Sequence, residues 1–107
     1  MKAQNLLNPL PDAFEGEVFD DLLSRPGLRL ERIVSHGQGS PEGFWYEQQQ
    51  HEWVLVLEGE AELGFEGGEA VHLAKGCCQL LPAGVKHRVN WTAPDRPTVW
   101  LALFFDP

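Results

Sequence analysis

Residues Gly76-Cys-Cys-Gln-Leu-Leu-Pro82-Ala-Gly84-Val-Lys-His87 are the most informative part of this sequence. They read as a turn glycine, a short apolar strand, a Pro-x-Gly turn and a histidine that begins another strand. A turn of this kind would present His87 at the mouth of a β-barrel, where ligands commonly bind. We therefore expect a barrel with a small-molecule site around His87.

The chain from Leu28 onward also favours strands, because short alternating or apolar runs are separated by glycine turns. Tight turns at Gly59 and at Gly67-Gly68 predict hairpins. This pattern predicts an all-β fold, an antiparallel barrel or sandwich. The expected strands cover residues 28–34, 44–48, 52–58, 61–65, 69–73, 77–81, 87–91 and 98–105.

Residues 1–27 are expected to form an N-terminal arm and a short helix, ahead of a barrel of residues 28–107. The helix prediction rests on an apolar stripe with the spacing i, i+1, i+4 and i+5. Ser24-Arg-Pro-Gly27 would end the helix. The stripe consists of Val18, Phe19, Leu22 and Leu23.

The formal net charge of −8 over 107 residues disfavours binding to a phosphate backbone, so we expect no nucleic-acid partner. No apolar run approaches the roughly 20 residues that span a bilayer, and the N-terminus has no signal-peptide pattern, so we expect no membrane association and a cytoplasmic location. Cys77 and Cys78 are adjacent, and we expect two unpaired thiols that serve as small apolar residues, one facing the core.

The 76–87 segment resembles the second sequence motif of the cupin superfamily, whose fixed positions match Gly76, Pro82, Gly84 and His87. Glu52 and Gly59 have the spacing of the glutamate and final glycine in the first cupin motif. Residues 43–46, 52–57 and 98–104 are similar to those of small single-domain bacterial cupins of unassigned reaction. The resemblance implies a cupin-type double-stranded β-helix, or jelly-roll barrel, and a homodimer.

The two histidine positions of the first cupin motif fall on Tyr46 and Gln48 in this chain. Because side chains alternate along a strand, Tyr46, Gln48, Gln50 and Glu52 would share the face that points into the barrel. His51 would then point outward, unless a bulge turns it inward. We expect a pocket that holds Glu52, His87, Tyr46 and one or two of the amides.

Two functions follow from this residue set, and the sequence does not decide whether the protein is an enzyme. The first is a small-molecule-binding cupin with a divalent metal (Zn, Fe, Mn or Ni) held by Glu52 and His87, with help from Gln48 or His51. The alternative is a metal-free cupin that binds a small sugar or carboxylic acid, as a sensor or an acid–base isomerase. In both cases the partner is a small polar molecule.

Overall fold

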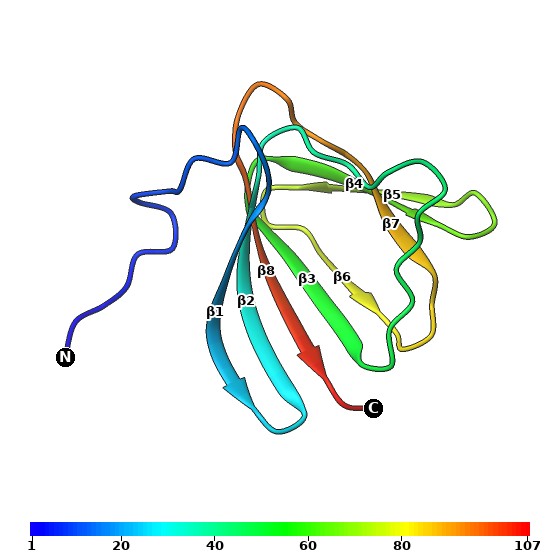
Figure 1. Ribbon diagram of the computed structural model, residues 1–107, viewed down its shortest axis with the longest axis horizontal. Coiled ribbons are helices and arrows are strands. Elements are labelled where there is room, and N and C mark those ends of the chain that lie inside the picture. Colours follow the sequence, from blue (N-terminus) through cyan, green and yellow to red (C-terminus); the bar gives the residue numbers. More distant parts are fainter.

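The computed structural model describes all 107 residues and contains eight strands in two sheets (Figure 1). The sheets follow the orders β1-β2-β8-β3-β6 and β5-β4-β7, with antiparallel pairing throughout. The all-β jelly-roll expectation is confirmed. The strands are β1 (Val18–Arg25), β2 (Leu28–Ser35), β3 (His51–Glu58), β4 (Glu60–Phe65), β5 (Ala70–Ala74), β6 (Cys78–Leu81), β7 (His87–Thr92) and β8 (Thr98–Phe105).

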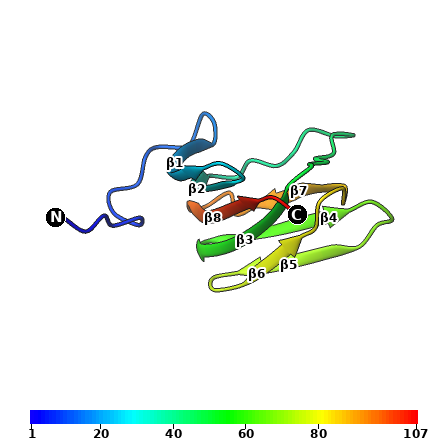
Figure 2. The ribbon, with the colours of Figure 1, turned by 90° about the horizontal axis from the view of Figure 1, so that it is seen from below.

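The two sheets pack face to face, as the view from below shows (Figure 2). Apolar side chains alternate inward along the central strands, and this alternation buries one face of each sheet. The largest core cluster joins β3, β4 and β8 to one residue each of β5 and β6. Its buried members are Val54, Val56, Ala61, Leu63, Leu73, Leu81, Trp100, Ala102 and Phe104.

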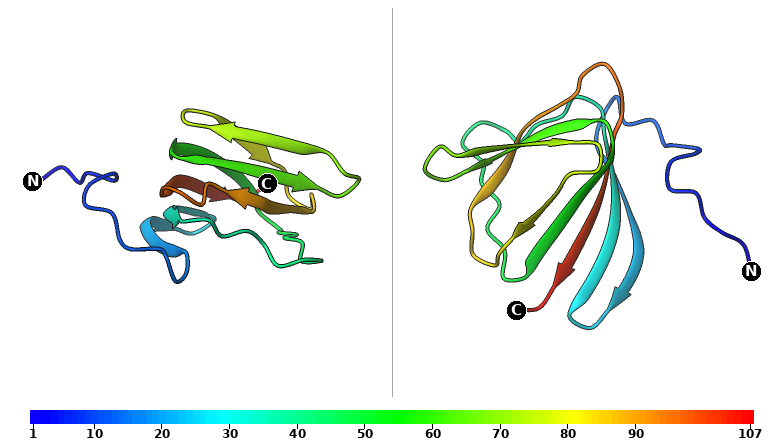
Figure 3. Two further views of the ribbon diagram at one scale, coloured as in Figure 1. Left: turned by 90° about the horizontal axis from the view of Figure 1, so that it is seen from above. Right: turned by 180° about the vertical axis from the view of Figure 1, so that it is seen from behind.

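The predicted N-terminal helix is wrong, because Val18–Arg25 forms the edge strand β1. This strand pairs with β2, and its register shifts between Asp21 and Leu23. Such a bulge interrupts the two-residue alternation of a strand, so the apolar residues acquire a spacing that resembles a helical stripe. The residues before β1 contain no strand or helix, and the N-terminal part of this segment projects from one side of the barrel (Figure 3), whereas Ala13 packs in a small core cluster with Val34 and Val99.

Two smaller expectations also change. The segment 44–48 is not a strand, and its one β-bridge joins Tyr46 to His87. Cys77 and Cys78 are unpaired, as expected, but both are exposed, so neither thiol packs in the core. No helix in the structure is long and apolar enough to cross a membrane.

Candidate functional site

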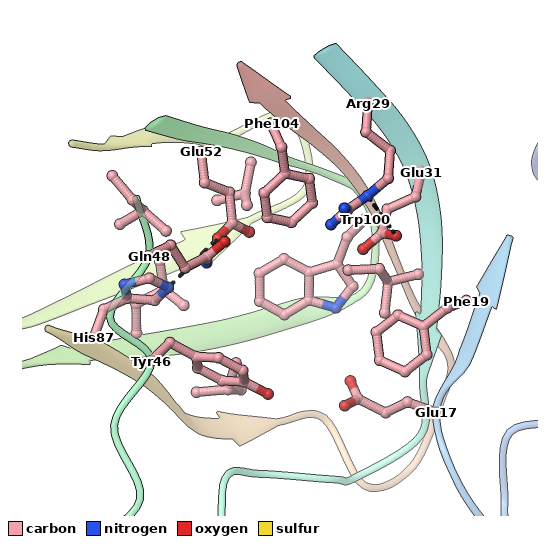
Figure 4. A pocket seen from close by; sticks show the side chains of 15 residues that line it. Glu17, Phe19, Arg29, Glu31, Tyr46, Gln48, Glu52, His87, Trp100 and Phe104 are labelled. Atoms are coloured by element: carbon pink, nitrogen blue, oxygen red, sulfur yellow. Dashed lines mark hydrogen bonds and ion pairs between the residues drawn. The ribbon is translucent and has the colours of Figure 1, made fainter. Parts of the chain in front are cut away.

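A cavity of about 290 Å³ lies between the two sheets and is lined by fifteen residues, nine of them hydrophobic (Figure 4). Polar side chains gather at its two ends, and Trp100 and Phe104 lie between them. At one end are Tyr46, Gln48, Glu52 and His87; at the other are Glu17, Phe19, Arg29 and Glu31. The remaining walls are Ile33, Val54, Leu63, Leu81 and Val89.

Glu52 and His87 face each other inside this cavity. Glu52 occupies an inward position of β3 in the five-stranded sheet, and His87 is the first residue of β7 in the three-stranded sheet. The distance between Glu52 Oε1 and His87 Nε2 is 3.5 Å. Both residues are buried, with 8% and 5% of their surfaces exposed. Buried charges of this kind are normally paired, because an isolated carboxylate or imidazolium loses its hydration.

Hydrogen bonds fix the orientation of both groups. The Gln48 amide Nε2 donates to Glu52 Oε1 over 2.7 Å. His87 Nδ1 lies 3.1 Å from the Val85 carbonyl oxygen, which can only accept, so Nδ1 carries the proton. The second ring nitrogen, Nε2, is therefore the one that faces Glu52. Such a fixed tautomer is what a general acid, a general base or a metal ligand requires.

The Pro82-Ala-Gly84 turn holds these residues in place through backbone contacts. Gly84 donates its N–H to the Gln48 carbonyl over 2.8 Å, and the backbones of Tyr46 and His87 exchange hydrogen bonds of 2.7 and 3.0 Å. The Tyr46 ring also stacks on the His87 ring, with 5.6 Å between centroids and 22° between planes. The irregular segment before β3 is thus tied to the start of β7.

The electrostatics of the site favour a protonated His87. Burial of the imidazole acts to lower the pKa of His87, but hydrogen bonds to Glu52 and to the Val85 carbonyl, together with the Glu52 charge, raise it above its ordinary value. The pKa of Tyr46 is also raised, first by burial and then by the charges of Glu17 and Glu52. The phenol therefore stays protonated and can donate a hydrogen bond.

His51 and Gln50 do not line the cavity. His51 faces the outside of the Pro82-Ala-Gly84 turn, where its Nδ1 accepts the Ala83 N–H over 2.9 Å, and its ring lies 5.2 Å from that of Phe105. No bulge turns His51 inward, because β3 pairs with β8 in an unbroken register from His51 to Val56. Gln50 precedes that strand and donates its amide to Asp106 over 3.0 Å.

The far end of the cavity contains charged residues that were not predicted from the sequence. Arg29, Glu31 and Ile33 occupy alternate positions of β2 and face inward, while Leu28 and Leu30 occupy the other face. Burial raises the pKa of Glu31; Arg29 opposes this effect, and the charges of Asp21 and Glu52 add to it. The spacing of Arg29, Glu31 and Ile33, each two residues apart, indicates that the three side chains lie on one face of the strand.

These residues do not fit a catalytic metal centre with three strong protein ligands. No three His, Cys, Asp or Glu side chains come together in the structure. The end of the cavity at His87 offers one imidazole, the carboxylate of Glu52 and the amide of Gln48, whereas His51 is turned away. A weaker set of Glu52, His87 and the Gln48 oxygen is the largest that the geometry allows.

Comparison with known proteins identifies the family of this chain. The family model described as "Cupin domain" matches residues 32–104, which include β3, the 82–84 turn and His87. The chain is a cupin. None of the curated proteins matches it.

Several solved structures have the same fold. A protein from Ralstonia eutropha JMP134, described as a candidate mannose-6-phosphate isomerase, is 44% identical, covers 100% of both chains and has a TM-score of 0.94. An RmlC-like cupin from Desulfovibrio desulfuricans is 20% identical, covers 97% of this cupin and 96% of its own chain, and has a TM-score of 0.75. A cupin superfamily protein from Desulfitobacterium hafniense DCB-2 is 14% identical, covers 92% and 84%, and has a TM-score of 0.76.

Proposed function

We propose that this cupin binds a small polar molecule in its cavity and that Glu52 and His87 transfer protons on it, as in an acid–base isomerase. The observation that carries the proposal is the buried pair itself, with Glu52 Oε1 and His87 Nε2 3.5 Å apart at one end of the cavity. Adjacent acid and base groups within a partly dry pocket are the arrangement that proton transfer needs. The isomerase description of the 44% identical relative supports the same class of reaction.

The proposed chemistry suits a hydroxy-carbonyl compound. Glu52, which accepts a hydrogen bond from the Gln48 amide, removes the proton from the carbon next to the carbonyl, while His87 Nε2 donates a proton to the carbonyl oxygen. The product is an enediol. Glu52 then delivers its proton to the former carbonyl carbon, and His87 Nε2 takes up the proton of the neighbouring hydroxyl group, which gives the isomer and restores both side chains. The reaction consumes no external oxidant or reductant.

The test is hydrogen exchange in D₂O. Aldoses and ketoses, free and phosphorylated, are incubated with the protein, and the proton beside the carbonyl is followed by ¹H NMR. We expect loss of this signal with the wild type and a rate reduced by about 10²-fold or more in Glu52→Gln and in His87→Asn. His51→Ala, which alters a histidine outside the cavity, is the matched control and should retain the rate. Exchange that persists in both site variants would contradict the proposal.

A divalent metal held by Glu52 and His87 is the second candidate. The observation in its favour is the Nδ1–H to Val85 carbonyl contact, because ligating histidines commonly donate their other ring nitrogen in this way. Rotation of the Gln48 amide would add its oxygen as a third donor. Elemental analysis of protein purified without chelator or histidine tag tests this candidate. Near-stoichiometric Zn, Fe, Mn or Ni that is lost in His87→Ala would support it, and a metal-free protein that takes up none would contradict it.

We also propose a homodimer and a cytoplasmic location for this cupin. The dimer is supported by the edge strand β1, which carries two exposed apolar side chains, Phe19 at 56% and Leu23 at 41% exposure. Light scattering coupled to size-exclusion chromatography measures the mass directly. A mass near 24 kDa, about twice the 12.0 kDa of one chain, supports the dimer, and a mass near one chain contradicts it.

A further inference from the structure

The charged groups at the far end of the cavity are arranged unfavourably for an anionic ligand. Arg29 is the only lysine or arginine among the lining residues, against the three carboxyl groups of Glu17, Glu31 and Glu52. The Arg29 guanidinium lies 4.2 Å above the Phe104 ring, and its Nε is 3.6 Å from Glu31 Oε2. Its positive charge is therefore already shared with a carboxyl group and an aromatic face.

The neighbouring cations serve other partners. Arg32 points to the opposite face of β2, where it pairs with Asp20 over 2.7 Å. Arg88 donates to the Ser40 carbonyl over 2.9 Å, and Lys86 lies 3.4 Å from Glu66. The protein also has no helix whose N-terminus could receive a phosphate. Arg29 is therefore the one guanidinium or ammonium group in the lining that could face an anion, and no second one is available to balance the charge of a dianion.

The aromatic side chains between the two polar ends of the cavity can pack against the C–H faces of a hydroxylated ring. Trp100 and Phe104 lie between the Glu52–His87 end and the Glu17–Glu31 end (Figure 4). The Trp100 indole is held by the bond from its Nε1 to Ser35 Oγ, 3.1 Å long, and Ser35 in turn donates to Glu17. Aromatic faces accept C–H surfaces, while carboxylates and the Tyr46 hydroxyl at the rim can bond to hydroxyl groups. A cavity of about 290 Å³ is at the small end of ordinary ligand sites.

We propose that the ligand of this cupin is a small uncharged, hydroxyl-bearing molecule such as a free monosaccharide, and that the cavity excludes the phosphate esters of such molecules. A phosphate placed near Glu17 and Glu31 would meet like charges in a region of low dielectric constant, where repulsion is strong. The inference rests on the proposed function, which places a small polar ligand in this cavity. It restricts that ligand to uncharged, hydroxyl-bearing molecules. The proposed uncharged ligand differs from the phosphorylated sugar that is named in the description of the 44% identical relative.

Direct binding measurements on matched pairs test the inference. Mannose with mannose-6-phosphate, and fructose with fructose-6-phosphate, are titrated into the wild-type protein and followed by amide chemical shifts in NMR spectra. We expect a free sugar to bind and its phosphate ester to bind at least about tenfold more weakly. An ester that binds as tightly as the free sugar, or free sugars that produce no shifts up to about 10 mM, would overturn the inference.

Two variants with the same change in net charge test whether the cavity causes the difference in affinity between a free sugar and its phosphate ester. Glu31→Gln removes one carboxyl group from the lining and releases Arg29, so it should reduce the difference between free sugar and ester by about threefold or more. Glu62→Gln changes the net charge equally but lies outside the cavity, where Glu62 accepts from Asn90 over 3.0 Å, and it should leave the difference unchanged. Equal effects of the two variants would overturn the assignment.

The two proposals fail in different ways. A free sugar that binds in the cavity but exchanges no proton would contradict the acid–base function and support the ligand class. Proton exchange with a phosphorylated sugar alone, lost in Glu52→Gln, would support the function and overturn the ligand class.

Discussion

Gly59, at the turn between β3 and β4, is the position where one added methyl group should most disturb the barrel. Its φ of +86° is a left-handed conformation that costs other residues about 1–2 kcal/mol. A Cβ atom there would also lie 2.6 Å from the Pro97 carbonyl oxygen and from Thr98 Cα, and crowding of a packed region costs about 1–3 kcal/mol. Gly59→Ala should therefore lower the free energy of unfolding by about 2–5 kcal/mol.

Gly68→Ala is the matched control for this prediction. Gly68 has a similar φ of +96°, but a Cβ atom there would meet nothing within 4 Å, so only the backbone cost of about 1–2 kcal/mol applies. Both substitutions change the entropy of the unfolded chain equally, and the difference of about 1–3 kcal/mol isolates the crowding against Pro97 and Thr98.

Urea unfolding followed by tryptophan fluorescence measures both variants. With a slope of about 2 kcal/mol/M, the midpoint of Gly59→Ala should lie about 0.5–1.5 M below that of Gly68→Ala. Equal midpoints would refute the reasoning, because they would mean that the turn relaxes away from β8 without cost.

Two further predictions concern residues around the cavity. Burial raises the pKa of Glu31 despite Arg29, so ionised Glu31 destabilises the folded state at pH values above the carboxyl pKa of the unfolded chain. Glu31→Gln should therefore resist urea better than the wild type at pH 7 and lose this advantage near pH 4. A variant that is less stable than the wild type at pH 7 would contradict a raised Glu31 pKa. His51→Ala removes the acceptor of the Ala83 N–H and should cost about 1 kcal/mol of stability while leaving ligand affinity unchanged in the NMR titration, whereas a loss of binding equal to that of His87→Ala would place His51 in the site.

The sequence was sufficient to predict the residues on the two cupin motifs that meet in the structure. Gly84 and Gly59 have positive φ angles, which explains why turns at these positions need glycine. Glu52 and His87 could be placed on one cavity because strand alternation gives Glu52 an inward position and the 82–84 turn leads directly into His87. Tyr46 and Gln48 also line the cavity, although their segment has only one bridge.

The sequence was not sufficient where tertiary packing overrides local pattern. The bulge between Asp21 and Leu23 gave β1 the spacing of a helix, and only its pairing with β2 reveals a strand. In β2 the charged residues Arg29 and Glu31 face the cavity, which reverses the usual assignment of the apolar face to the interior. Gln50 lies outside the cavity because regular strand structure begins only at the next residue.

The most direct test of a coupled Glu52–His87 pair is an NMR titration of the His87 imidazole in the wild type and in Glu52→Gln. Because the pKa of His87 is raised in the folded protein, the pair stabilises the fold fully below the unfolded pKa, and this contribution is lost as the pH rises through the folded pKa. The account predicts a wild-type His87 pKa above the ordinary value of about 6.5 and a lower value in Glu52→Gln. A wild-type pKa at or below that value, or one that Glu52→Gln leaves unchanged, would contradict it.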